Sequence, residues 1–272
     1  MIPAPFTYQR ASSVREALDL AAAGGEDAKF LAGGHSLLPL MKLRLAAPQT
    51  LIDVGRIGEL GYIRDEGDHI AVGALTTHDD VSRSALLAEQ LPLLAHAAGQ
   101  VGDPQVRHRG TIGGSLAHGD PAGDLPAVML ALGASMTVRG PDGDREIPAD
   151  DFFLGFLETA LEPGELLTQV SVPKPASSGW SFQKFTKRAI DWAIVGVAVQ
   201  GGSVALVNMG PTPLRAGAVE NALASGAAPA DAAAHAAEGT SAPDDLTGSR
   251  GYREHLARVL VERALAEAAT RS

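Results

Sequence analysis

Apolar and polar residues alternate along the chain in short blocks, and the spacing within each block predicts a structural element. Near the N-terminus, apolar residues between Val14 and Ala21 recur at i, i+3, i+4 and i+7, which is typical of a helix that buries one face. Ser13 precedes Glu16 by three residues, the spacing of a capping box. Gly24 directly follows the apolar stripe, so a helix is predicted to end there.

Shorter apolar runs bounded by glycine or proline predict strands, and longer runs with caps predict helices. The predicted strands cover residues 29–31, 51–54, 70–72, 135–139, 145–147, 166–172, 182–187, 194–199 and 204–208. One predicted helix begins at Thr77. Others cover residues 91–98, residues 126–132 and the alanine-rich stretch 222–237. The last predicted helix is a segment in which Leu256, Val259, Leu260 and Ala264 share one face. Strands and helices are therefore mixed along the chain.

One segment has the composition of a linker. Residues 173–179 contain two prolines, two serines and a glycine, and they follow directly on a predicted strand. We therefore predict a domain boundary there, with one domain over residues 1–175 and a smaller one over residues 176–272.

Composition and charge exclude several classes of function. The chain has 272 residues and a formal net charge of −10, so it is a poor nonspecific partner for nucleic acid or anionic lipid. It contains no cysteine, which excludes disulfides, cysteine-bound metal clusters and a thiol nucleophile. The apolar stretch Ile194 to Val199 is far shorter than the ~18 residues of a membrane span, and we see no secretory signal. We expect a cytoplasmic protein with no integral membrane segment.

Two glycine-centred segments are the strongest candidates for chemistry. They cover residues 31–39, with Gly33-Gly34 and Ser36, and residues 109–120, with Gly113-Gly114 and Ser115. Glycine lets backbone N–H groups approach a phosphate closely, and a run of such groups forms an anion-binding nest. Two separate segments of this kind suit a diphosphate bound between two lobes. The alternative is that both are tight turns, since Gly-Gly is common in turns.

Other motifs are absent or ambiguous. No G-x-G-x-x-G and no Gly-Lys-Ser/Thr occurs, and Ala117 breaks the nucleophile-elbow pattern begun by Gly113. His35, His108 and His118 do not have metal-ligand spacing, so we expect loop histidines and no metal site. Asp124 precedes Pro126 by two residues, so it is either a helix N-cap or a ligand contact near the second glycine segment.

The two segments resemble the flavin loops of one family. Ala32-Gly33-Gly34-His35-Ser36 and Thr111-Ile112-Gly113-Gly114-Ser115 are similar to those of the FAD-binding medium subunits of aerobic carbon monoxide dehydrogenase and the molybdenum hydroxylase (xanthine dehydrogenase) family. Residues 43–48, 73–78, 101–107 and 210–216 also resemble the family, so the similarity covers most of the chain.

This resemblance implies an α+β fold. A two-lobed α/β FAD-binding domain of the PCMH type, with sub-lobes at about 1–55 and 56–175, would precede a small domain with a three-stranded antiparallel sheet and a helical bundle. It also implies no catalytic side chain and a noncovalent FAD. The residues implied to bind it are Lys29, Ala32, Gly33, Gly34, His35, Ser36, Thr111, Ile112, Gly113, Gly114, Ser115, Asp124, Leu167, Lys184 and Trp192. For Trp192, a place in the core is the alternative to stacking on the flavin ring.

The function implied is electron transfer within an oxidoreductase. A large partner subunit would hold the molybdenum cofactor, a small partner subunit would hold [2Fe–2S] clusters, and FAD in this chain would pass electrons to an external acceptor. The assembly expected is a dimer of heterotrimers, in the cytoplasm or peripherally at the inner membrane face. Two other hypotheses remain from the residues alone: a self-sufficient FAD-dependent oxidase or dehydrogenase, and a non-enzymatic binding module.

Overall fold

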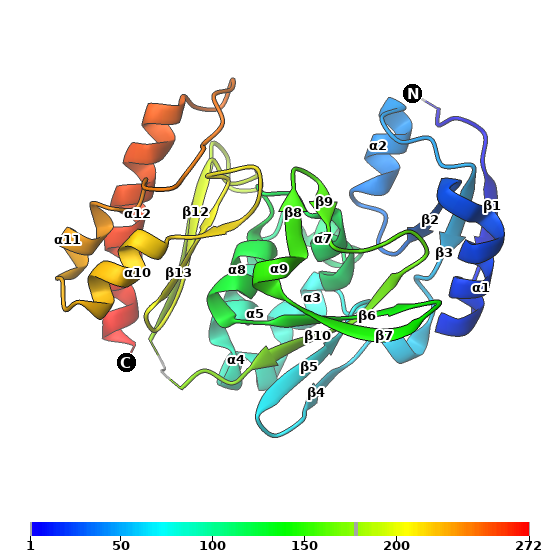
Figure 1. Cartoon of the computed structure of the whole chain (residues 1–272), viewed down its shortest axis with the longest axis horizontal. Coiled ribbons are helices and arrows are strands. Elements are labelled where there is room, and N and C mark those ends of the chain that lie inside the picture. Colours follow the sequence, from blue (N-terminus) through cyan, green and yellow to red (C-terminus); the bar gives the residue numbers. More distant parts are fainter. Residues whose placement is uncertain (1, 177–178, 272) are drawn as a thin grey trace.

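The first lobe is a small parallel sheet covered by one helix. The computed structural model describes residues 2–176 and 179–271, and this lobe lies at one end of it (Figure 1). Its sheet has the strand order β1 (Thr7–Arg10), β3 (Thr50–Asp53), β2 (Ala28–Leu31). Helix α1 (Val14–Gly24) buries the predicted apolar stripe, and Ser13 caps it by accepting a hydrogen bond from the Glu16 N–H.

The second lobe is built on a five-stranded antiparallel sheet. Its strand order is β4 (Ile63–Asp65), β5 (His69–Gly73), β10 (Leu166–Pro173), β6 (Ser135–Gly140), β7 (Gly143–Pro148). A two-stranded sheet pairs β8 (Phe153–Gly155) with β9 (Glu158–Thr159). The lobe also contains the helices α3 (His78–Arg83), α4 (Ala85–Gln90), α5 (Pro92–Gly99), α6 (Pro104–Arg107), α7 (Ile112–His118), α8 (Asp124–Leu132) and α9 (Ala149–Phe152).

The C-terminal unit has one more strand than the sequence predicted. Its antiparallel sheet has the order β11 (Trp180–Phe185), β12 (Val195–Gln200), β13 (Ser203–Val207), β14 (Leu214–Arg215). The two-residue strand β14 was not expected, because two residues carry no detectable periodicity. Helix α12 (Arg250–Thr270) lies along β11 and β12, and α8 packs against β12 and β13 (Figure 1).

Helix α8 joins the second lobe to the C-terminal unit. All nine of its residues are buried, so it is apolar on every side, as expected of a helix between two layers. One core cluster accordingly contains residues of this helix, of strand β5 and of strands β12 and β13. The expected α+β architecture is confirmed, and its two parts share a hydrophobic core.

The alanine-rich stretch is helical in part, as its composition predicted, and it is divided between two helices. It forms the short helices α10 (Gly217–Ala224) and α11 (Pro229–Ala233). Gly226 between them has φ +86°, a left-handed conformation that glycine adopts without strain and that ends a helix. The domain boundary near residue 176 stays a prediction, and Ser177 and Ser178 of the predicted linker lie outside the described residues.

Two short 3-10 helices, η1 (Gly25–Asp27) and η2 (Gly58–Leu60), also lie in the N-terminal part of the chain. Among the residues described here, no helix combines the length and the apolar character that crossing a membrane requires.

Two nearby phenylalanines provide a test of this packing. Phe152 is fully buried, whereas Phe156 is 67% exposed. We predict that Phe152→Ala lowers the free energy of unfolding by about 3–5 kcal/mol, because it leaves a cavity in the core. Phe156→Ala should change it by about 0.5 kcal/mol or less. Urea denaturation of both variants measures this difference, and equal midpoints would contradict the assignment of Phe152 to the core.

Candidate functional site

A cavity of about 510 Å³ lies where the two lobes and the C-terminal unit meet. Every residue that the sequence proposed for the site lines it, except Ile112. The side chain of Ile112 is fully buried in the hydrophobic core instead. The residues brought together are Lys29, Ala32, Gly33, Gly34, His35, Ser36, Thr111, Gly113, Gly114, Ser115, Asp124, Leu167, Lys184 and Trp192.

The first glycine segment presents unpaired backbone donors to this cavity. Strand β2 ends at Leu31, Gly34 takes φ +77°, and helix α2 (Leu37–Leu43) begins after Ser36. Within the described residues, the N–H groups of residues 33–36 donate to no protein acceptor. The His35 Nδ1 lies 3.0 Å from the Gly33 carbonyl oxygen, which holds the ring against the loop. This segment has the open N–H groups that an anion-binding cradle needs.

The second glycine segment differs from the nest that the sequence suggested. Thr111 is the N-cap of helix α7, and its Oγ1 accepts a hydrogen bond of 3.1 Å from the Gly114 N–H. The N–H groups of residues 112, 113 and 115 donate to the carbonyls of residues 76, 74 and 111. These donors are therefore already paired within the protein, so the segment contributes its close backbone approach and its hydroxyl groups.

The two glycine segments touch each other across the cavity. A Cβ added to Gly33 would lie 2.1 Å from the carbonyl oxygen of Arg109, which no side chain tolerates. A Cβ on Gly113 would lie 2.5 Å from the Cβ of Ala74. Both glycines are therefore required by close contacts within the protein.

A buried ion pair forms another part of the wall. The Nζ of Lys184 donates to the Asp124 Oδ2 at 2.7 Å and to the Gln100 carbonyl at 3.0 Å, and both side chains of the pair are only 6% exposed. Gly123 is the N-cap of α8 and Asp124 is its first residue, so the N-cap alternative for Asp124 is wrong.

Only one of the two carboxylate oxygens of Asp124 has a hydrogen-bond partner within the described structure. Its Oδ1 is buried and has no hydrogen-bond partner within the described structure. Burial raises the pKa of Asp124 to about 6, although the charge and the hydrogen bond of Lys184 act in the opposite direction. A donor that entered the cavity and reached Oδ1 would stabilise the charged form.

His78 is a cavity residue that the sequence analysis missed. It is 4% exposed, its Nδ1 has no partner within the described structure, and burial lowers its pKa to about 4. Thr77 was recognised as the start of a helix, but no local pattern indicated that the next side chain faces a cavity behind Gly110.

Leu167 and Trp192 occupy different environments on the wall. Leu167 is 4% exposed, whereas Trp192 is 59% exposed and lies on the connection between β11 and β12. The alternative of a core tryptophan is therefore wrong, because Trp192 presents an open ring to the cavity.

His35, His78 and His118 line the cavity, whereas His108 lies outside it. His108 pairs with Asp79 at 3.3 Å, and burial lowers the pKa of His118. In the part of the chain that the structure describes, no three side chains of metal-binding type lie close enough to hold an ion.

Comparison with known protein families gives two consecutive matches. Residues 4–175 match the FAD binding domain in molybdopterin dehydrogenase, and residues 180–268 match the CO dehydrogenase flavoprotein C-terminal domain. The chain is 44% identical to the carbon monoxide dehydrogenase medium chain of Hydrogenophaga pseudoflava, over 97% of both chains. It is 40% identical to subunit alpha of the 6-hydroxypseudooxynicotine dehydrogenase complex of Paenarthrobacter nicotinovorans, over 100% of this chain and 97% of that one.

Solved structures agree with the sequence matches. A chain of carbon monoxide dehydrogenase from Hydrogenophaga pseudoflava superposes with a TM-score of 0.96 at 45% identity, covering 100% of this chain and 99% of that one. The fold and the cofactor expected from the sequence are thereby confirmed. The chain belongs to the FAD-binding medium-subunit family of the molybdenum-containing dehydrogenases, and it is a flavoprotein subunit of an oxidoreductase.

Proposed function

We propose that this chain is the electron-exit subunit of a molybdenum hydroxylase complex. Its noncovalent FAD supplies the redox chemistry by receiving electrons from [2Fe–2S] clusters of a small partner and delivering them to an external acceptor. Substrate oxidation belongs to a large partner with the molybdenum cofactor, and the clusters belong to the small partner, since this chain contains no cysteine to hold them.

The observation that carries this proposal is the meeting of the two glycine segments. Residues 33–36, whose N–H groups donate to no acceptor within the described protein, line the cavity beside the contact between Gly33 and the Arg109 carbonyl. Such donors bind a diphosphate, and the ammonium of Lys29 on the same wall adds a positive charge. The loops are thus suited to hold the bridge of FAD without a covalent attachment.

The remaining wall residues are assigned to the flavin end. Asp124 and Lys184 form a pair that is already desolvated, and the free Oδ1 of Asp124 can accept a hydrogen bond from a bound ring N–H. Leu167 supplies an apolar contact, and the exposed ring of Trp192 suits stacking. These residues bind, orient and exclude water, and none acts as a nucleophile.

The proposal names the kinds of partner subunit, and it does not name a particular substrate. One relative is a medium chain of carbon monoxide dehydrogenase and another is a subunit of a 6-hydroxypseudooxynicotine dehydrogenase complex, so similar chains serve complexes named for different substrates. We infer that the large partner determines the substrate. A dimer of heterotrimers, a cytoplasmic location and peripheral contact with the inner membrane face stay predictions.

The assembled complex tests this division of labour. After addition of the complex's own substrate, the flavin absorbance near 450 nm should bleach only when all three subunits are present. The isolated, FAD-loaded chain should leave every candidate substrate unchanged. Substrate oxidation by the isolated chain would instead support a self-sufficient flavin enzyme, and a chain that takes up no FAD would support the binding-module hypothesis.

The glycine contact yields a matched pair of variants. Gly33→Ala places a methyl group against the Arg109 carbonyl and should reduce the FAD content per chain about tenfold, because the loops must separate. Gly58→Ala is the control, since a Cβ there meets no atom within 4 Å and φ is not positive. FAD released by heat denaturation measures both, and equal flavin content would contradict the assignment of the loops.

The Asp124 carboxyl predicts a pH dependence of FAD affinity. Its pKa is raised to about 6 in the free cavity, so between pH 5 and 7 the group loses its proton and becomes a better acceptor. FAD affinity should therefore rise across this range in the wild type and vary less in Asp124→Asn. Isothermal titration of both proteins with FAD at several pH values measures this, and parallel profiles would exclude this role for Asp124.

A further inference from the structure

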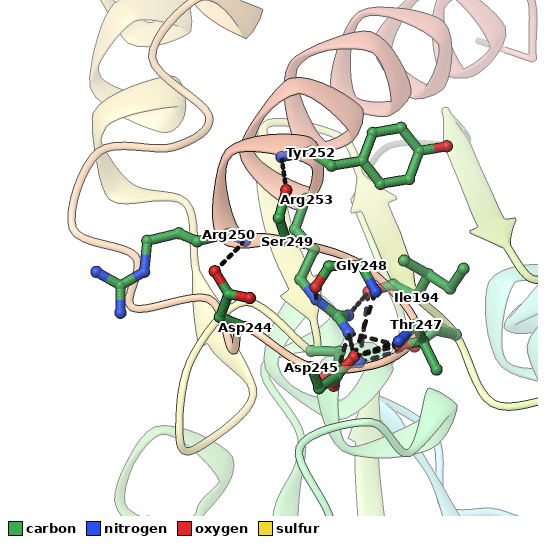
Figure 2. Close-up of polar contacts among 11 residues, drawn as sticks. Ile194, Asp244, Asp245, Thr247, Gly248, Ser249, Arg250, Tyr252 and Arg253 are labelled. Carbon is green, nitrogen blue, oxygen red and sulfur yellow. Dashed lines mark hydrogen bonds and ion pairs between the residues drawn. The ribbon is translucent and has the colours of Figure 1, made fainter.

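A fully buried arginine lies outside the flavin cavity yet contacts the segment that carries Trp192. Arg253 sits in the first turn of α12, its side chain is 0% exposed, and it does not line the cavity. A buried guanidinium is costly unless its N–H groups are paired, so its partners indicate what it is there to hold. Figure 2 shows these partners gathered around it.

One side of the guanidinium is fixed by the segment before α12. Its Nη2 donates to both carboxylate oxygens of Asp245, at 2.8 and 2.9 Å, and to the Thr247 Oγ1 at 2.7 Å. Thr247 also donates from its hydroxyl and its N–H to the Asp245 carboxylate, and these bonds, with Arg253, lower the pKa of Asp245 to about 2. The carboxylate is therefore charged at neutral pH, and it orients the arginine.

The other side of the guanidinium reaches the base of the Trp192 segment. The Arg253 Nη1 donates to the Ile194 carbonyl (Figure 2), and the Asn208 Nδ2 donates to the Ala193 carbonyl at 2.9 Å and to the Ile194 carbonyl at 3.3 Å. The two carbonyls that follow Trp192 are thus held by side chains from two other segments. Asn208 is itself fixed, because its N–H donates to the Pro121 carbonyl at 2.8 Å.

These contacts matter for Trp192 because they hold the backbone just after it, together with the Ile194 N–H, which donates to the Phe185 carbonyl at 2.8 Å. Its ring is 59% exposed, and it stands between the flavin cavity and a second cavity of about 660 Å³ whose wall includes Asp245, Thr247 and Asn208. The strand ladder begins only at Val195, beyond the tryptophan. The direction of the Trp192 backbone is therefore set at Ala193 and Ile194.

We propose that Arg253, oriented by Asp245 and Thr247, is a positioning residue for the flavin site that fixes the Trp192 ring through the Ile194 carbonyl. Arginine suits this role because its planar guanidinium donates hydrogen bonds to a carboxylate and to a carbonyl at the same time, whereas lysine has a single ammonium group. The part of the inference that concerns flavin rests on the proposed function, whereas the part that concerns the mobility of Trp192 does not.

The experiment uses Trp192 as its own reporter. The chain has two tryptophans, so a Trp180→Phe background leaves Trp192 as the only indole. In this background, Arg253→Met should lower the fluorescence anisotropy of Trp192, increase its quenching by acrylamide and raise the dissociation constant of FAD about tenfold, the effect of losing one charged hydrogen bond. Arg253→Lys should restore thermal stability in part but leave the anisotropy low.

The control and a second variant make the test decisive. Arg263→Met removes an exposed arginine from the same helix and should change none of these readouts. If Arg253→Met does not fold, Asp245→Asn replaces it, because it removes the carboxylate charge that orients Arg253 and keeps the size of the side chain. It should lower the Trp192 anisotropy in the same way, and unchanged anisotropy would overturn the proposal.

Two outcomes are distinguishable. A folded Arg253→Met with a lower melting temperature but unchanged Trp192 anisotropy would overturn the proposal and leave Arg253 a purely structural residue. If the unsubstituted chain binds no FAD, the proposed function fails, and the anisotropy comparison still decides whether Arg253 positions Trp192.

Discussion

The close approach of two backbone segments is the constraint on which the site depends. Gly33 lies against the Arg109 carbonyl so tightly that no Cβ fits, and Gly113 lies equally tightly against Ala74. The first contact joins the two lobes and the second holds helix α7 onto the second lobe, so the cavity is shaped by backbone atoms that cannot be displaced cheaply. A preformed cavity lowers the entropy that ordering would otherwise cost when a long dinucleotide binds.

The polar groups are divided between the two sides of this cavity. In the described part of the chain, unpaired N–H groups lie on the first segment, whereas those of residues 112–115 on the second segment donate to Thr76, Ala74 and Thr111. At the other end, the Asp124–Lys184 pair is buried with one carboxylate oxygen unsatisfied. A half-satisfied buried carboxyl costs stability unless a donor reaches it, so the free chain carries a cost that a bound ligand can relieve.

Local patterns in the sequence predicted much of the fold and the lining of the site. The cap at Ser13, the strand before Gly33 and the two strands on either side of residues 140–143 all follow from neighbouring residues, and the structure confirms them. The membership of Lys184 and Asp124 in one site was not derivable from spacing, since 60 residues separate them, and it came from the resemblance to a family.

Other features depend on contacts between residues that lie far apart in the sequence, and the spacing of apolar residues does not predict them. Ile112 was grouped with its glycine neighbours, but the start of α7 turns its side chain into the core. His78 became part of the wall only because Gly110 leaves room in front of its ring. Arg253 interrupted no pattern in the last helix, so nothing in the sequence indicated that its charge is buried and paired with Asp245.

A crystal structure of the chain grown with excess FAD tests the central claim most directly. The account predicts the diphosphate between the two glycine segments, with the N–H groups of residues 33–36 donating to its oxygens and a ring donor within hydrogen-bond distance of the Asp124 Oδ1. A dinucleotide bound elsewhere, or N–H groups of residues 33–36 that contact no phosphate oxygen while the protein is saturated with FAD, would contradict it.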